Sequence, residues 1–291
     1  MRSGSHVTLR DRPVGGDLSA YVKSRVPGRG GRMILLVHGF NTTQEEARAG
    51  YVAFDELIGR VAPRLGASLC PVYWPGDSAM KGGAYPWLVA RAAASGARLA
   101  DWLGEIMAKR PGEVVIVAHS LGCRLTLEAI ARLPDHLARR IRIFLMAAAV
   151  PVDVFDDQAE QSAEMRDALA RATGRVLSAD ALYSPADGVL AFWFRLGQTA
   201  APGEIGVLPE AVGLNGRPGR PVWSRIAEMP GYDHGQYWSG HRMVAHLAHR
   251  LGAAVTKPRP VRLAARPRLV PERSDPDARP GPPARRLLPR R

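Results

Sequence analysis

The chain has too few cysteines for a disulfide framework. Among its 291 residues only Cys70 and Cys123 occur, a usage typical of proteins from a reducing compartment. Cysteine clusters that could hold a metal are also absent, and His246 and His249 lack the glutamate of the His-Glu-x-x-His zinc helix. We therefore expect no disulfide, no bound metal and no organic cofactor.

Long apolar runs are missing as well. The longest, residues 143–152, has about ten residues and contains Pro151, whereas a membrane span needs about 20. The first 17 residues are polar and charged, without the apolar core of a secretory signal. These absences predict a cytoplasmic protein without a transmembrane segment. The 46% hydrophobic content is nevertheless enough to build one large core.

Positive charge is abundant but unevenly distributed. The chain has 40 Lys and Arg against 27 Asp and Glu, a net charge of +13. Residues 257–291 contain eleven of the basic residues, three acidic residues and nine prolines, a composition that predicts a disordered tail. Such a tail could contact nucleic acid or an anionic membrane surface. The tail has no aromatic residue for base stacking. The whole chain has 36 Arg against 4 Lys, a bias that could reflect the nucleotide composition of the gene instead.

Strand and helix patterns alternate from residue 32 onward. The continuous apolar run at 33–37 is typical of a buried parallel strand, and further strands are expected at 68–74, 114–117 and 141–147. Further strands are expected at 175–183 and 222–228, helices at 158–172 and 239–251, and an extended loop at 198–221. Thr43 and Glu46 form a capping-box signature before a helical apolar stripe. The alternation predicts an α/β fold, with a mostly parallel central sheet and helices on both faces.

We divide the chain into three parts. Residues 32–256 form the α/β domain, and residues 257–291 form the disordered Arg/Pro-rich tail. Residues 1–31 are rich in Gly and Arg and form either an edge strand, which could be antiparallel, or a partly flexible segment.

One segment of the sequence points to chemistry. Residues 118–122, Ala-His-Ser-Leu-Gly, lie between an apolar strand pattern and a helical pattern, the context of a nucleophile elbow. The turn would hold Ser120 in a strained conformation, so the residues two positions away must be small, as Ala118 and Gly122 are. Ala118 replaces the usual glycine. The alternative is an ordinary helix N-terminus capped by the Ser120 side chain.

A serine nucleophile needs a base oriented by a carboxylate, in the chain order serine, acid, histidine. His234 follows the last predicted strand in a flexible loop, and we choose it as the base. His241, which begins a helix, is the weaker alternative. We expect His38 to brace the loop after the first main strand, and the His119 side chain to point away from the nucleophile.

The acid has several candidates. Asp187 lies just beyond a strand of the right rank, 47 residues before His234, and we choose it. Asp180 lies within that strand, where its carboxylate would be buried without an obvious partner or would point to the wrong face. The alternative acids, after the preceding strand, are Asp153, Asp156 and Asp157.

Acyl transfer also requires preset hydrogen-bond donors for the oxyanion. The Leu121 N–H is one candidate, because it lies at a helix N-terminus where the dipole favours negative charge. The second is the Phe40 N–H, in a loop where Gly39 lets the backbone turn inward and Asn41 could support the turn or cap the next helix.

Substrate would then bind above Ser120, near Phe40 and the loops at 75–87 and 198–221. Seven aromatic residues could line an apolar pocket there, although most fit core or lid packing better: Trp74, Tyr85, Trp87, Trp193, Phe194, Tyr237 and Trp238.

These motifs together resemble the α/β-hydrolase superfamily. Residues 38–43 (His-Gly-Phe-Asn-Thr-Thr), 73–76 (Tyr-Trp-Pro-Gly) and 118–122 are similar to a mostly uncharacterised bacterial group with a His-Gly-Tyr/Phe-Asn loop. Residues 183–187 and 233–238 look like the acid and histidine segments of that group. The resemblance covers about residues 32–252 and implies a Ser-Asp-His hydrolase. The resemblance supplies no substrate. Our first hypothesis is a serine hydrolase that cleaves an ester, a thioester or a related acyl compound through an acyl-enzyme intermediate.

A second hypothesis is a protein that keeps this fold for binding or scaffolding without turnover, with the basic tail available for anionic surfaces. The complete set of Ser120, Asp187 and His234 argues against it.

Overall fold

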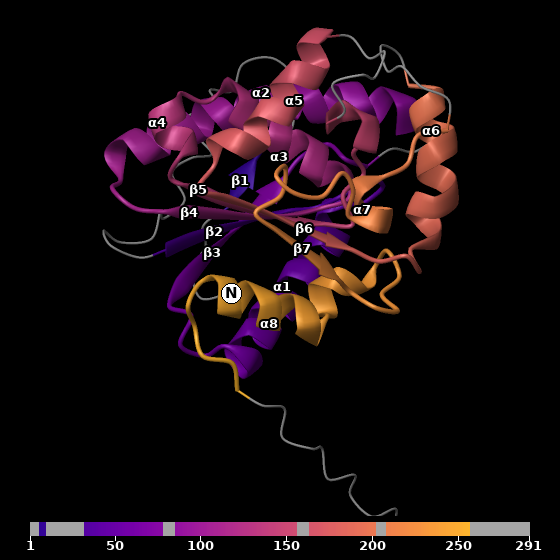
Figure 1. Ribbon diagram of the computed structural model, residues 1–291. Helices are drawn as coiled ribbons and strands as arrows, with labels where there is room; N and C mark the ends of the chain where they lie inside the picture. The colour runs from indigo at the N-terminus through magenta and orange to yellow at the C-terminus, as the bar shows by residue number, and fades with distance from the viewer. Residues whose placement is uncertain (1–5, 10–31, 78–84, 156–162, 202–207, 257–291) are drawn as a thin grey trace, which may run out of the picture. The chain divides into compact units, whose positions relative to one another are not determined.

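A computed structural model describes residues 6–9, 32–77, 85–155, 163–201 and 208–256 (Figure 1). The expected tail at 257–291, most of the segment at 1–31, the start of the helix expected at 158, and Asp156 and Asp157 lie outside these residues.

Within the described residues, the chain forms a seven-stranded sheet of order β1-β3-β2-β4-β5-β6-β7. Every neighbouring pair is parallel, which confirms the predicted fold class. The edge strand near the N-terminus is also parallel rather than antiparallel, with Val7 paired to Val72. The strands are β1 (Val7–Thr8), β2 (Arg32–Val37), β3 (Ala67–Tyr73), β4 (Val114–His119), β5 (Ile141–Met146), β6 (Ser178–Tyr183) and β7 (Arg225–Glu228).

Helices cover both faces of the sheet (Figure 1). On one face lie α1 (Gln44–Val61) and α8 (His241–Arg250); on the other lie α2 (Tyr85–Lys109), α3 (Leu121–Arg132) and α5 (Ala163–Arg175). The shorter helices are α4 (Asp135–Ala138), η3 (Val152–Phe155), η4 (Val189–Phe194), α6 (Arg195–Thr199), α7 (Val212–Asn215) and η5 (Gln236–Ser239). None of the helices in the described ranges combines the length and the hydropathy needed to cross a bilayer.

The expected capping box begins α1. The Glu46 N–H donates to Thr43 Oγ1 at 3.2 Å, and the Thr43 N–H donates to Glu46 Oε2 at 2.8 Å. In the apolar stripe that follows, Tyr51 and Phe54 are fully buried.

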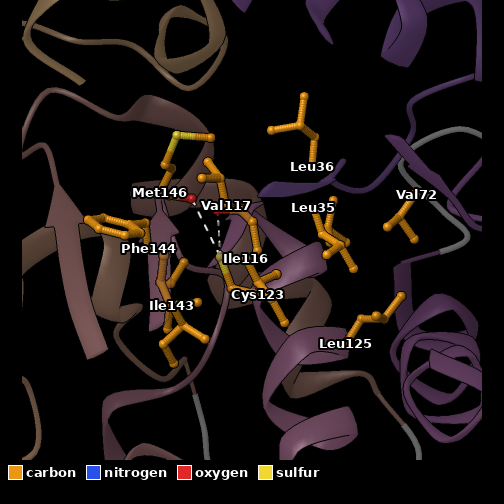
Figure 2. Packing of buried hydrophobic residues seen from close by; sticks show 14 of the residues in the cluster. Leu35, Leu36, Val72, Ile116, Val117, Cys123, Leu125, Ile143, Phe144 and Met146 are labelled. Carbon is orange, nitrogen blue, oxygen red and sulfur yellow. Dashed lines mark hydrogen bonds between the residues drawn. The ribbon is translucent and has the colours of Figure 1, made fainter. Parts of the chain in front are cut away.

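The core lies on both sides of the central strands. All six residues of β4 are buried, because helices cover both faces of a parallel sheet. Figure 2 shows Cys123 of α3 beside Ile116 of β4, and the Cys123 thiol donates to the carbonyl of Met146 in β5 at 3.6 Å. Both cysteines, Cys70 and Cys123, are buried free thiols.

Two expectations about the second half of the chain are wrong in detail. The loop expected at 198–221 contains α7 and the end of α6, and the turn just before Asp187 leads into the helical segment formed by η4 and α6. Arg175 ends α5 instead of beginning β6. Its guanidinium donates to the Ile130 and Ala131 carbonyls at the end of α3, which ties the two helices together.

Candidate active site

Ser120 lies in the sharp turn between β4 and α3. Its backbone angles, φ 54° and ψ −126°, fall in a region that residues with a Cβ rarely occupy. The Ser120 N–H donates to the Met146 carbonyl at 2.9 Å, and its own carbonyl accepts from Cys123 and Ala149. The Ser120 side chain makes no capping hydrogen bond to α3. The strained turn is therefore present, and the alternative of a helix-capping serine is wrong.

Two glycines let the β2 loop approach this turn. A Cβ on Gly122 would lie 2.3 Å from the His38 carbonyl oxygen, and a Cβ on Gly39 would lie 2.7 Å from the Ser120 Cβ. Real Cβ atoms essentially never come within 3.0 Å of a non-bonded heavy atom, so both positions require glycine.

The structure brings Ser120, His234 and Asp187 together. His234 Nε2 lies 2.9 Å from Ser120 Oγ, and His234 Nδ1 lies 2.7 Å from Asp187 Oδ2. A neutral imidazole with its proton on Nδ1 donates to Asp187 and accepts from the serine hydroxyl. The Asp187 carboxylate is fully buried, and its other oxygen accepts the Leu190 N–H at 3.0 Å.

Ser184 connects the segments that carry the acid and the base. Its hydroxyl donates to the Tyr232 carbonyl at 2.6 Å, two residues before His234, and its carbonyl accepts the Asp187 N–H at 3.2 Å. Sequence reasoning missed this residue, since a serine next to Pro185 is an ordinary turn residue.

His119, whose side chain we expect to point away from the nucleophile, contacts the candidate base. His119 Nε2 donates to the His234 carbonyl oxygen at 2.7 Å, and the two ring centroids are 4.8 Å apart. Burial, together with the neighbouring His234 ring, lowers the pKa of His119 to about 3. The ring is therefore neutral near pH 7, and its Nε2–H tethers the backbone of the candidate base.

The loop after β2 adjoins Ser120. His38 braces it as expected: His38 Nε2 accepts the Trp74 N–H at 3.3 Å, and Trp74 Nε1 donates to the His38 carbonyl at 2.8 Å. Asn41 has φ 52°, and its N–H donates to the Gly76 carbonyl at 2.7 Å. Thr43 caps α1, so Asn41 supports the loop. Phe40 lies between Gly39 and Asn41 within it.

The other candidate donor, Leu121, is the first residue of α3. Its N–H therefore has no carbonyl four residues earlier within the helix and lies at the positive end of the helix dipole.

The alternative residues belong to other elements of the fold. His241 begins α8, and its Nε2 is buried without a hydrogen-bond partner among the described residues. Asp153 lies in η3. Of the two alternatives for Asp180, a buried carboxylate without a partner is wrong: Asp180 accepts from His246 Nε2 at 2.9 Å and from Arg250 Nε at 2.7 Å, both on α8.

Most of the aromatic residues considered for a pocket pack in the core instead. Trp74, Phe194 and Tyr237 are buried, and the Trp238 ring packs edge-on against Tyr51 and Phe54 of α1. Trp87 and Trp193 are exposed, and the Tyr85 side chain lies outside the described residues. In the part of the chain that the structure describes, no three His, Cys, Asp or Glu residues gather as metal ligands would.

Comparison with solved structures gives distant likenesses. The esterase PE8 is 13% identical, with 77% of this chain and 94% of that chain covered and a TM-score of 0.44. The product of gene lin2722 from Listeria innocua is 12% identical (75% and 92% covered, TM-score 0.43). TT1662 from Thermus thermophilus is 15% identical (78% and 92% covered, TM-score 0.42).

No curated protein matches the chain. Residues 17–207, about two thirds of the chain, match a family described as "Alpha/beta hydrolase of unknown function (DUF900)". This match agrees with the parallel sheet and its covering helices, and the chain therefore belongs to that α/β-hydrolase family.

Proposed function

We propose that the protein is a serine hydrolase that cleaves an ester, a thioester or a related acyl substrate. Ser120 is the nucleophile, His234 the general base and Asp187 the acid that orients it. One observation carries this proposal. The His234 ring bridges the Ser120 hydroxyl at 2.9 Å and a buried carboxylate at 2.7 Å, from three separate parts of the chain.

In the proposed reaction, Ser120 Oγ attacks the substrate carbonyl while His234 Nε2 takes the hydroxyl proton. The Asp187 carboxylate stabilises the resulting imidazolium, which then gives its proton to the leaving group. Water, activated by the same imidazole, hydrolyses the acyl-enzyme and restores Ser120. These steps require only the side chains of the chain itself, so the proposal includes neither a metal nor an organic cofactor.

The proposed oxyanion hole consists of the Leu121 and Phe40 N–H groups. Two features support it. Leu121 directly follows Ser120 in the chain, and Gly39 of the Phe40 loop closely approaches Ser120. Each such donor is typically worth about 3 kcal/mol in the transition state.

Hydrolysis of p-nitrophenyl esters of graded chain length tests the proposal. Ser120→Ala should lower kcat/KM by about a thousandfold or more, whereas the matched control Ser239→Ala, at an exposed position, should not. His234→Ala should be nearly as damaging as Ser120→Ala, because members of one catalytic unit fail together.

Two results would contradict this assignment. If His241→Ala lost activity while His234→Ala kept it, His241 and not His234 would be the base. A Ser120 that a fluorophosphonate labels, without turnover of any ester in a broad panel, would favour the rival hypothesis of a non-catalytic binding protein.

A further inference from the structure

The candidate base lies on a loop and not on a helix or strand. This loop runs between β7, which ends at Glu228, and η5, which begins at Gln236. Within it, Gly231 has φ 74°, and a Cβ added there would meet open space. Displacement of a catalytic group by about 1 Å can lower a rate about a hundredfold. The contacts that fix this loop therefore bear on the reactivity of the site.

One anchor of the loop is the Ser184 hydroxyl. It donates to the Tyr232 carbonyl at 2.6 Å, directly after Gly231. Ser184 is itself held in place, because it is fully buried just after β6 and its N–H donates to the Gly213 carbonyl at 3.1 Å. The same hydroxyl accepts the Ala186 N–H at 3.3 Å. The first anchor thus joins the loop of the base to the turn that precedes the acid.

The second anchor is the His119 ring, which donates from Nε2 to the His234 carbonyl at 2.7 Å. His119 is the last residue of β4 and is paired with Met146 of β5 in the sheet. The ring also approaches the loop after β2, since a Cβ added to Gly39 would lie 3.1 Å from its Nδ1. This anchor thus connects the end of a central strand directly to the backbone of the candidate base.

The His119 anchor requires a proton on Nε2. A carbonyl oxygen accepts and cannot donate, so the neutral ring must carry its proton on Nε2 and not on Nδ1. Burial lowers the pKa of His119 to about 3, which keeps the ring neutral near pH 7. When His234 becomes an imidazolium in the proposed reaction, the neighbouring ring therefore adds no repulsive charge.

Both anchors end on backbone carbonyls and not on reacting atoms. We propose that Ser184 and His119 are positioning residues, which hold the loop of the candidate base at two points. Because the two carbonyls belong to Tyr232 and His234, the anchors fix both the place and the direction of the backbone between them. The His234 Nε2 thereby stays within reach of the Ser120 hydroxyl. This inference rests on the proposed function, since the two residues act only through the base.

Two amide variants isolate the His119 anchor. His119→Gln can place an N–H close to the position of Nε2, whereas the side chain in His119→Asn is one methylene shorter and leaves the His234 carbonyl out of reach. Ser184→Ala removes the other anchor. The control Thr173→Val removes a buried hydroxyl that donates to the Ala170 carbonyl within α5. An unfolding midpoint above the assay temperature shows that each variant is folded when it is measured.

The rate at which a fluorophosphonate labels Ser120 is the first readout. His119→Asn and Ser184→Ala should each lower this rate about tenfold, and the double variant about a hundredfold, because reactivity falls steeply as a catalytic group is displaced. His119→Gln should recover most of the loss of His119→Asn. Thr173→Val should be labelled as fast as the parent.

The second readout needs no reaction. The His234 Nδ1 proton donates to Asp187 at 2.7 Å, and its downfield ¹H NMR signal is identified by its loss in His234→Ala. We expect this signal in the parent and in Thr173→Val, and its loss through exchange with solvent in the double variant. A purely structural role of the two anchors would lower the unfolding midpoint but leave the signal and the labelling rate unchanged.

Three outcomes would overturn the inference about the anchors. The folded double variant could be labelled as fast as the parent, the parent and the double variant could show the same downfield signal, or the parent could lack that signal. Glutamine as damaging as asparagine at position 119 would refute the role of the Nε2–H. A parent that shows the signal but is not labelled would instead contradict the proposed function, and the signal alone would then test the anchors.

Discussion

Unusual backbone conformations gather where the candidate site lies. Asn41, Ser120 and Ala147 are non-glycine residues with positive φ, each just after the carboxyl end of a strand: β2, β4 and β5. Such conformations cost about 1–3 kcal/mol each and persist only where the surrounding contacts impose them. At Ser120 those contacts are the backbone hydrogen bonds with Met146 and Ala149.

His119 gives a prediction at the residue scale. Its pKa is about 3 in the folded protein against 6.5 ordinarily, so the unfolded chain binds more protons between these pH values. Stability therefore does not depend on His119 titration above pH 6.5. Below pH 6.5, the free energy of unfolding declines as the pH falls toward 3, by up to about 1.4 kcal/mol per pH unit.

Urea unfolding of the parent and His119→Asn measures this effect. Asparagine does not titrate, so the variant should lose less stability than the parent between pH 6.5 and about pH 5, before most carboxylates titrate. Identical slopes in the two proteins would mean that His119 does not resist protonation when folded.

Among the secondary-structure elements, β2, β4 and α3 meet closely at Gly122. Gly122→Ala would push a methyl group into the His38 carbonyl, which we expect to cost about 2 kcal/mol or more and to displace the Phe40 loop. Gly104 provides the matched control, because it lies inside α2 with no atom within 4 Å of an added Cβ. Gly104→Ala should instead stabilise the protein by about 0.5–1 kcal/mol through helix propensity. Thermal unfolding distinguishes the two, and equal shifts would refute the proposed close packing.

The closing helix α8 is fastened to the sheet by an ionic contact. Arg250 and His246 of α8 bind the fully buried carboxylate of Asp180 in β6. Arg250→Met would leave that carboxylate with His246 as a partner, at an expected cost of about 3 kcal/mol in the free energy of unfolding.

An exposed ion pair provides the comparison. Arg217 and Glu210 lie 3.4 Å apart with both side chains about half or more exposed, so Arg217→Met should change stability by less than about 0.5 kcal/mol. Denaturant titration of both variants checks the difference, and a loss at Arg250 no larger than that at Arg217 would contradict it.

At the scale of the whole molecule, features coded by neighbouring residues could be predicted from the sequence. The central strands β2 and β4 contain continuous apolar runs, and the turn at Ser120 lies between a strand and a helix pattern with small residues on both sides. The chosen residues Ser120, Asp187 and His234 also meet in space, because the carboxyl ends of parallel strands share one edge of the sheet.

Features that depend on distant contacts could not be predicted. His119 contacts the segment of the candidate base 115 residues away in the sequence, and Ser184 contacts it 48 residues away. The partners of Asp180, His246 and Arg250, follow it by 66 and 70 residues. The helical segment after Asp187 was missed for another reason: apolar residues on both of its faces blur the amphipathic pattern that indicates a helix.

In the proposed function, folding makes the Ser120 hydroxyl reactive by assembling it with His234 and Asp187. Intact mass spectrometry after exposure to a fluorophosphonate tests it most directly. We predict a single adduct on Ser120 in the folded protein, and none in Ser120→Ala or in parent protein unfolded by urea, where the three side chains separate. A folded parent that remains unlabelled would contradict this role of Ser120. Equal labelling of the parent and of His234→Ala would contradict activation of Ser120 by His234.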